Sequence, residues 1–74
     1  MKLGLYLQQL IKSELESLKE NANFTEEEMI VFTLLSKGCS RQEIALKNCV
    51  SVATVDRRVR AIKNKIKKIG SGNN

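Results

Sequence analysis

The sequence contains no histidine and only two cysteines, Cys39 and Cys49, among its 74 residues. A structural zinc site needs four ligands, which come mainly from cysteine and histidine. One chain cannot complete such a set, so we expect no metal and no cofactor. The sequence also lacks a paired-carboxylate pocket and a glycine-rich phosphate loop. We therefore expect no catalytic residue and do not expect an enzyme.

Aromatic residues are scarce as well, since the chain has one tyrosine, two phenylalanines and no tryptophan. The core must therefore be mainly aliphatic. No apolar run approaches the roughly 18 residues needed to cross a bilayer. Residues 3–11 are apolar but are interrupted by Gly4, Gln8 and Gln9, without a small-residue cleavage site, so they do not resemble an export signal. We expect a cytoplasmic protein whose cysteines are reduced packing residues rather than redox sensors.

Positive charge, in contrast, is abundant and is concentrated in the second half of the chain. The formal net charge is +5. Residues 1–24 are balanced and residues 25–39 carry a net charge of −2, whereas residues 40–74 carry nine Lys or Arg against two acids, a net of +7. Charge confined to one part of a small chain is typical of proteins that bind nucleic acid or an anionic membrane surface.

Apolar residues recur at steps of three and four near the N-terminus. This spacing predicts an amphipathic helix over about residues 3–20, within an N-terminal segment of residues 1–23. Its apolar stripe can pack on the rest of the domain or pair with a second subunit, and the two uses are compatible. The candidate dimer face consists of Leu3, Leu7, Leu10 and Leu18.

Two capping-box patterns predict where the next two helices begin. Thr25 is followed three residues later by Glu28, and Ser40 is followed by Glu43 in the same way. Gly38 is placed to end the first of these helices in a left-handed conformation. The second helix is short, and its apolar residues are Ile44, Ala45 and Leu46.

Ser51 is placed to cap a fourth helix that begins at Val52, only three or four residues after the third helix. So short a connection makes two helices cross steeply, and the small Ala45 allows their backbones to approach. We therefore expect an all-α fold, a compact four-helix domain of residues 1–74 with a helix-turn-helix. It would comprise a core of residues 24–70, the N-terminal helix and a frayed tail of residues 71–74. The fourth helix packs through Val52, Val55, Val59, Ile62, Ile66 and Ile69.

The outer face of this fourth helix is strongly basic. From Arg57 to Lys68 there are seven cationic residues and no acid, so no opposite charge within this run relieves their repulsion. A helix face that contacts only solvent does not require such an excess of positive charge. A helix lying on a membrane would carry Trp, Phe or Leu on its apolar face, whereas this one carries Val and Ile. We therefore expect double-stranded DNA as the partner, and no membrane.

The major groove of DNA admits one α-helix, whose exposed N-terminal half reaches the base edges. Arginine can donate two hydrogen bonds to guanine, alanine permits close approach to a thymine methyl, and aspartate can accept from a cytosine amine. The predicted base-contacting residues are Ala53, Asp56, Arg57 and Arg60, although Asp56 could instead orient Arg57 or Arg60 through a salt bridge. The predicted phosphate-contacting residues are Arg41, Thr54, Arg58, Lys63 and Lys67.

One set of residues falls, without a gap, in register with a known pattern. The set is Phe24-Thr25, Glu28, Val31, Leu34-Leu35, Ser40, Glu43-Ile44-Ala45, Val50-Ser51, Thr54-Val55, Val59 and Lys65-Ile66. Through it, residues 24–70 resemble the DNA-binding domain of LuxR-type regulators. The chain is also similar to region 4 of bacterial sigma factors and to small phage-type regulators, which share the helix-turn-helix.

The resemblance implies base contacts from Asp56, Arg57 and Arg60, and phosphate contacts from Thr54 and Lys63. The chain departs from the LuxR-type pattern at Asp56, where the family usually has Lys or Arg. We do not expect the further C-terminal helix through which these domains often dimerise, and we expect an extra helix at the N-terminus instead. The remaining departures are Arg58, in place of a frequent His, and Asn48, in place of a frequent Leu.

The sequence therefore predicts a sequence-specific DNA-binding transcription regulator that inserts the helix of about residues 52–69 into the major groove. We expect a homodimer, because one such helix reads only a few base pairs and two-fold pairing doubles the site. The alternative is an adaptor that resembles a detached sigma region 4. In that case the leucine stripe, or the acidic start of the second helix, would dock on RNA polymerase or another protein.

Overall fold

The structure, a computed structural model, describes the backbone of residues 3–71 and the side chains of residues 3–69. These residues form helices and contain no strand, which confirms the all-α fold. The helices are α1 (Leu3–Gln8), α2 (Lys12–Ala22), α3 (Glu26–Ser36), α4 (Arg41–Asn48) and α5 (Val52–Ser71).

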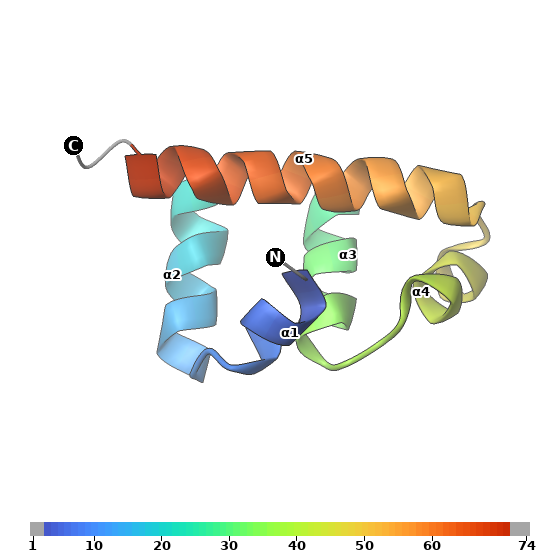
Figure 1. The fold of residues 1–74 in the computed structure, drawn as a ribbon, viewed down its shortest axis with the longest axis horizontal. Coiled ribbons are helices and arrows are strands. Elements are labelled where there is room, and N and C mark those ends of the chain that lie inside the picture. The colour runs from blue at the N-terminus through green and yellow to red at the C-terminus, as the bar shows by residue number, and fades with distance from the viewer. Residues whose placement is uncertain (1–2, 72–74) are drawn as a thin grey trace.

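Helix α5 lies along one long edge of the molecule, and the other four helices lie on one side of it (Figure 1). Helices α2 and α3 meet α5 steeply in this view, while α4 packs near its N-terminal end. Helix α1 packs on α3 and not along α5. Because α5 has 20 residues, it is about 30 Å long. It therefore spans most of the 38 Å length of the molecule and presents one continuous outward side.

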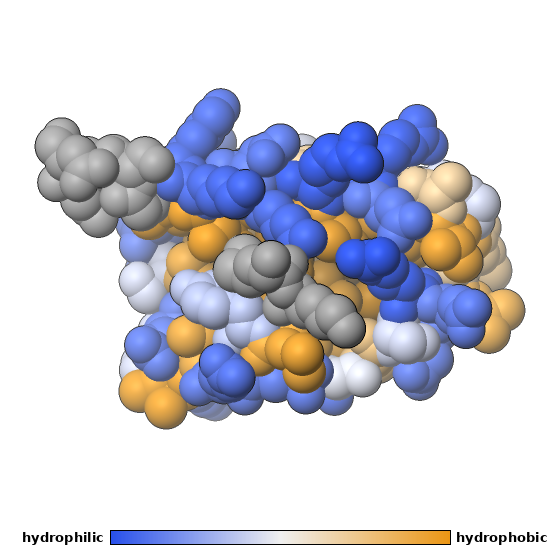
Figure 2. Space-filling model, in the orientation of Figure 1, coloured by the Kyte–Doolittle hydropathy of each residue, from blue (hydrophilic) through white to orange (hydrophobic). Residues whose placement is uncertain are grey.

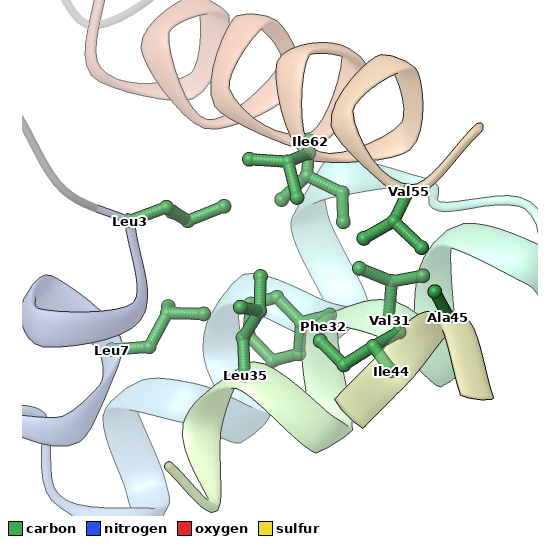
Figure 3. Close-up of a cluster of buried hydrophobic side chains, with 10 residues drawn as sticks. Leu3, Leu7, Val31, Phe32, Leu35, Ile44, Ala45, Val55 and Ile62 are labelled. Carbon is green, nitrogen blue, oxygen red and sulfur yellow. The ribbon is translucent and has the colours of Figure 1, made fainter. Parts of the chain in front are cut away.

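The core lies between α5 and the helices beneath it, and Figure 3 shows its side chains converging from α1, α3, α4 and α5. Phe32 is its largest fully buried side chain, and its ring centroid lies 5.1 Å from that of Phe24. Of the α5 stripe, Val55, Val59 and Ile62 are buried, whereas Val52 is exposed. The buried cluster consists of Leu3, Leu7, Val31, Phe32, Leu35, Ile44, Ala45, Val55, Val59 and Ile62.

The N-terminal segment differs from the prediction, because it forms two helices, α1 and α2, and not one. A straight helix over residues 3–20 would be about 27 Å long, whereas two shorter helices allow α1 to pack on α3 and α2 to pack on α5. The chain turns instead after Gln8, and the amides of Gln9 and Leu10 donate to the carbonyls of Tyr6 and Leu7, at 3.2 Å in both cases. The backbone amide of Ile11 then donates to the Glu14 carboxylate at 3.0 Å at the start of α2.

The candidate dimer face is changed by this turn. Leu3 and Leu7 are 2% and 0% exposed, because α1 presses them against the core. Leu10 and Leu18 are half-buried and pack against the same core. Leu3 and Leu7 therefore pack within the chain, which is one of the two uses expected for this stripe.

The predicted capping boxes are confirmed at α3 and α4. The Thr25 hydroxyl accepts from the Glu28 amide at 3.2 Å, and the Glu28 carboxylate accepts from the Thr25 amide at 3.0 Å. Ser40 and Glu43 make the same reciprocal pair, at 3.1 Å in both directions. Just beyond α3, Gly38 adopts a φ of +92°, a conformation in which glycine avoids the strain of a side chain. These local contacts fix where α3 and α4 begin, and therefore where α5 can follow.

Candidate nucleic-acid interface

Helix α4 and helix α5 are joined by only three residues, 49–51. Cys49 has a φ of +54° and so ends α4 in the left-handed conformation that glycine or asparagine more often supplies. Its amide donates to the Leu46 carbonyl at 3.3 Å, and the Val50 amide donates to the Ala45 carbonyl at 3.0 Å. Ala45 is buried in the core cluster. The turn is therefore closed by its own backbone hydrogen bonds and aims α5 across α4.

The start of α5 is organised by a small network of hydroxyl groups. The Ser51 hydroxyl accepts from the Thr54 amide at 3.1 Å, and the two hydroxyl oxygens are 3.0 Å apart. One terminal nitrogen of Arg57 donates to the Thr54 hydroxyl at 3.2 Å. Ala53, Arg57 and Arg60 are all exposed. The network therefore restrains Arg57 on the outward side of α5, next to the predicted base-contacting residues Ala53 and Arg60. It also occupies the Thr54 hydroxyl, which was predicted to contact phosphate.

Asp56 takes a partner that differs from both residues considered from the sequence. Its carboxylate pairs with Arg41 on α4, with 3.4 Å between Nε and Oδ1, and not with Arg57 or Arg60. The difference arises because Asp56 lies on the flank of α5 that faces the N-terminus of α4. The two side chains are 52% and 46% exposed, so the pair stabilises the fold by at most about 1 kcal/mol. Its main effect is to hold two predicted DNA contacts together.

We call the flank of α5 next to α4 the α4-side flank, and it comprises Asp56, Arg60, Lys63 and Lys67 of α5 together with Arg41 of α4. Lys67 belongs to it because it follows Lys63 by four residues on the same face of the helix. The flank contains a surface hollow, and Arg41 and Arg60 are exposed beside it. The hollow is lined by Arg41, Asp56, Val59, Arg60 and Lys63.

The opposite flank of α5, which we call the α3-side flank, comprises Thr54, Arg58, Ala61 and Lys65. Arg58 is half-buried there and lines two hollows together with Glu27. Lys65 forms an ion pair with Glu28. The cations of this flank therefore face the acidic first turn of α3, which the α4-side flank does not meet.

The ion pair between Glu28 and Lys65 joins α3 to the C-terminal half of α5. Glu28 is only 8% exposed. The Lys65 ammonium donates to its carboxylate and also to the Asn23 carbonyl at 3.2 Å. Burial raises the pKa of Glu28, but the hydrogen bond and charge of Lys65 and the hydrogen bonds from Thr25 outweigh burial, so the pKa lies below its ordinary value of 4.5. The contact joins residues 37 positions apart, and nothing in their local sequence patterns predicted it.

This lowered pKa predicts that Glu28 makes the fold sensitive to acid. A carboxyl group whose pKa is lower in the folded state contributes stability that is complete above its unfolded pKa and is lost as the pH falls through the folded pKa. Glu28→Gln should therefore reduce the free energy of unfolding by about 1–3 kcal/mol at pH 7 and flatten its decrease below about pH 4.5. Urea unfolding from pH 7 to pH 2.5 measures both effects. Glu20→Gln, a change at an exposed residue of α2, serves as the control, and an equal effect of the two changes would contradict this prediction.

The remaining cations of the basic run keep their charge available. Within the described part of the chain, Lys65 is the one member of the run from Arg57 to Lys68 that pairs with a carboxylate within 4.0 Å. Figure 2 shows hydrophilic side chains along the length of α5 on the face in view. The six cations without such a partner are Arg57, Arg58, Arg60, Lys63, Lys67 and Lys68.

Comparisons with models of protein families, with curated proteins and with solved structures find no match for this chain. No helix within residues 3–71 is both long enough and apolar enough to cross a membrane. The case for a function therefore rests on the geometry and charge of α5 and of the elements that hold it.

Proposed function

We propose that this protein is a sequence-specific DNA-binding transcription regulator in which α4, the turn of residues 49–51 and α5 act as a helix-turn-helix. Helix α5 enters the major groove, and the N-terminus of α4 lies over the sugar-phosphate backbone. The observation that carries the proposal is the run of six cations on α5 that lack a carboxylate partner among the described residues. Their mutual repulsion is unfavourable in the free protein and is relieved by a polyanion.

The apolar stripe of α5 supports a nucleic acid over a membrane surface. Val55, Val59 and Ile62 are buried in the core of the chain, so they are already used for packing. A helix that binds a membrane must instead offer its apolar face to lipid. The side of α5 left free carries the exposed Arg57 and Arg60, which have the chemistry to read guanine edges.

The proposal is tested by mixing the protein with a labelled random-sequence duplex of 20–30 base pairs and measuring binding at several salt concentrations. We expect binding that weakens steeply between about 50 and 200 mM salt, because each phosphate that the protein neutralises releases counterions. Sequencing the duplexes that remain bound should show enrichment of a short motif. If the protein does not bind duplex DNA even at the lowest salt concentration, the proposal fails.

A further inference from the structure

The two flanks of α5 carry unequal charge, although the sequence of the helix is basic throughout. On the α4-side flank, four cations face the single carboxylate of Asp56, which leaves a net charge of +3. On the α3-side flank, the two cations Arg58 and Lys65 face the two carboxylates of Glu27 and Glu28, so these four groups carry no net charge, and Arg57 of the outward side lines the same hollow. The folded chain therefore converts a basic helix into one with a basic side and a neutral side.

The two flanks also differ in how freely their cations can move. Lys67 and Arg60 are exposed, and Lys63 lines an open hollow. In contrast, the Lys65 ammonium is held by the Glu28 carboxylate and the Asn23 carbonyl. A phosphate on the α3-side flank would have to compete with this buried carboxylate and would lie near its negative charge.

A helix with its side chains is about 10–12 Å across, and the major groove is about 12 Å wide. Both flanks of a helix in the groove therefore approach a phosphate strand, one on each side. From the unequal charge we infer that the protein contacts the phosphates of one DNA strand, through Lys63, Lys67 and Arg41 on the α4-side flank. The other strand would face the α3-side flank, which offers it no net positive charge. The inference rests on the proposed function. It adds which flank of α5 contacts phosphates, and therefore that one strand of the groove provides most of the phosphate contacts.

Asp56 has a defined place in this arrangement. Its Oδ1 lies 3.4 Å from the Nε of Arg41, as an ion pair without a hydrogen bond. Arginine has five N–H donors in a rigid fork, so it can lie beside a carboxylate at one edge and donate to a phosphate from another. Asp56 is therefore a positioning residue that directs Arg41 toward the backbone, and it need not touch a base.

The experiment measures the slope of log affinity against log salt concentration for a 20-base-pair random duplex, with single-charge substitutions on each flank. Lys63→Gln and Lys67→Gln should each make the slope shallower by about 0.9, the value expected for one lost phosphate contact in B-DNA. Arg58→Gln also removes one positive charge, but from the α3-side flank, and should leave the slope unchanged. Far-UV circular dichroism and thermal melting establish that each variant is folded.

A second variant covers the case in which Arg58→Gln does not fold. Glu27 is exposed and supplies part of the negative charge on the α3-side flank, so Glu27→Gln should steepen the slope by allowing Arg58 to attract phosphate. Equal slope changes for Arg58→Gln and Lys63→Gln would overturn the inference, as would an unchanged slope for Glu27→Gln. Failure of the proposed function itself would look different, because the unmodified protein would then show no salt-dependent binding at all.

Discussion

Replacing both Arg57 and Arg60 with alanine should weaken binding to the selected DNA motif by at least about 30-fold, while the fold is retained. Each well-placed arginine contributes about 1–3 kcal/mol of discrimination for its base. Both side chains are exposed, so their loss leaves no cavity and no unpaired buried group. Titration of labelled duplexes measures the effect, with the selected motif compared against random sequence. We expect the preference for the motif to disappear with the affinity.

The matched control removes the same number of charges elsewhere. Lys12 at the start of α2 and Lys37 after α3 are exposed and do not lie on α5. The Lys12→Ala and Lys37→Ala double variant has the same net charge as the arginine variant but should keep its preference for the motif. A loss of preference in both variants would attribute the effect to total charge. An unchanged affinity in the arginine variant would exclude the outward side of α5 as the surface that reads DNA.

Features that depend on a few neighbouring residues could be predicted from the sequence. The capping boxes of Thr25 and Ser40 and the left-handed Gly38 each involve residues no more than three positions apart, so their geometry follows from local chemistry. The same holds for the apolar stripe of α5, since a helix that begins at Val52 must bring Val55, Val59 and Ile62 to one face. The all-α fold follows from such local patterns.

Features set by packing between distant segments could not be predicted. The stripe of Leu3 and Leu7 has helical spacing, but the turn after Gln8 depends on the space beside α3 and not on a local helix breaker. Asp56 lies within four positions of three arginines of α5, yet it pairs with Arg41 because α4 brings that residue to its flank. The link between Glu28 and Lys65 depends in the same way on how α3 meets α5. Each of these contacts changes what the cations of α5 can do.

The second large effect that we expect is a loss of stability when a core side chain is truncated. Phe32 is fully buried and lies on α3, between α1 and α5 in the cluster of Figure 3. Truncation of a buried phenylalanine to alanine costs about 3–5 kcal/mol, which includes the loss of its contact with Phe24. A domain of 74 residues has a total stability of only about 4–11 kcal/mol. Phe32→Ala should therefore remove a large share of this stability, and all of it at the lower end of the range.

Thermal melting and urea unfolding, both followed by far-UV circular dichroism, measure this loss. Leu46→Ala provides the control because Leu46 is 80% exposed and lies outside the core cluster, so its loss should change stability by no more than about 0.5 kcal/mol. Equal stability of the two variants would contradict the described packing. If Phe32→Ala remains partly folded, its apparent affinity for DNA should scale with the folded fraction and recover with cooling, because Phe32 supports α5 from beneath and touches no DNA. The arginine variant of α5 should show the opposite pattern, with an intact fold and a loss of DNA affinity that cooling does not restore.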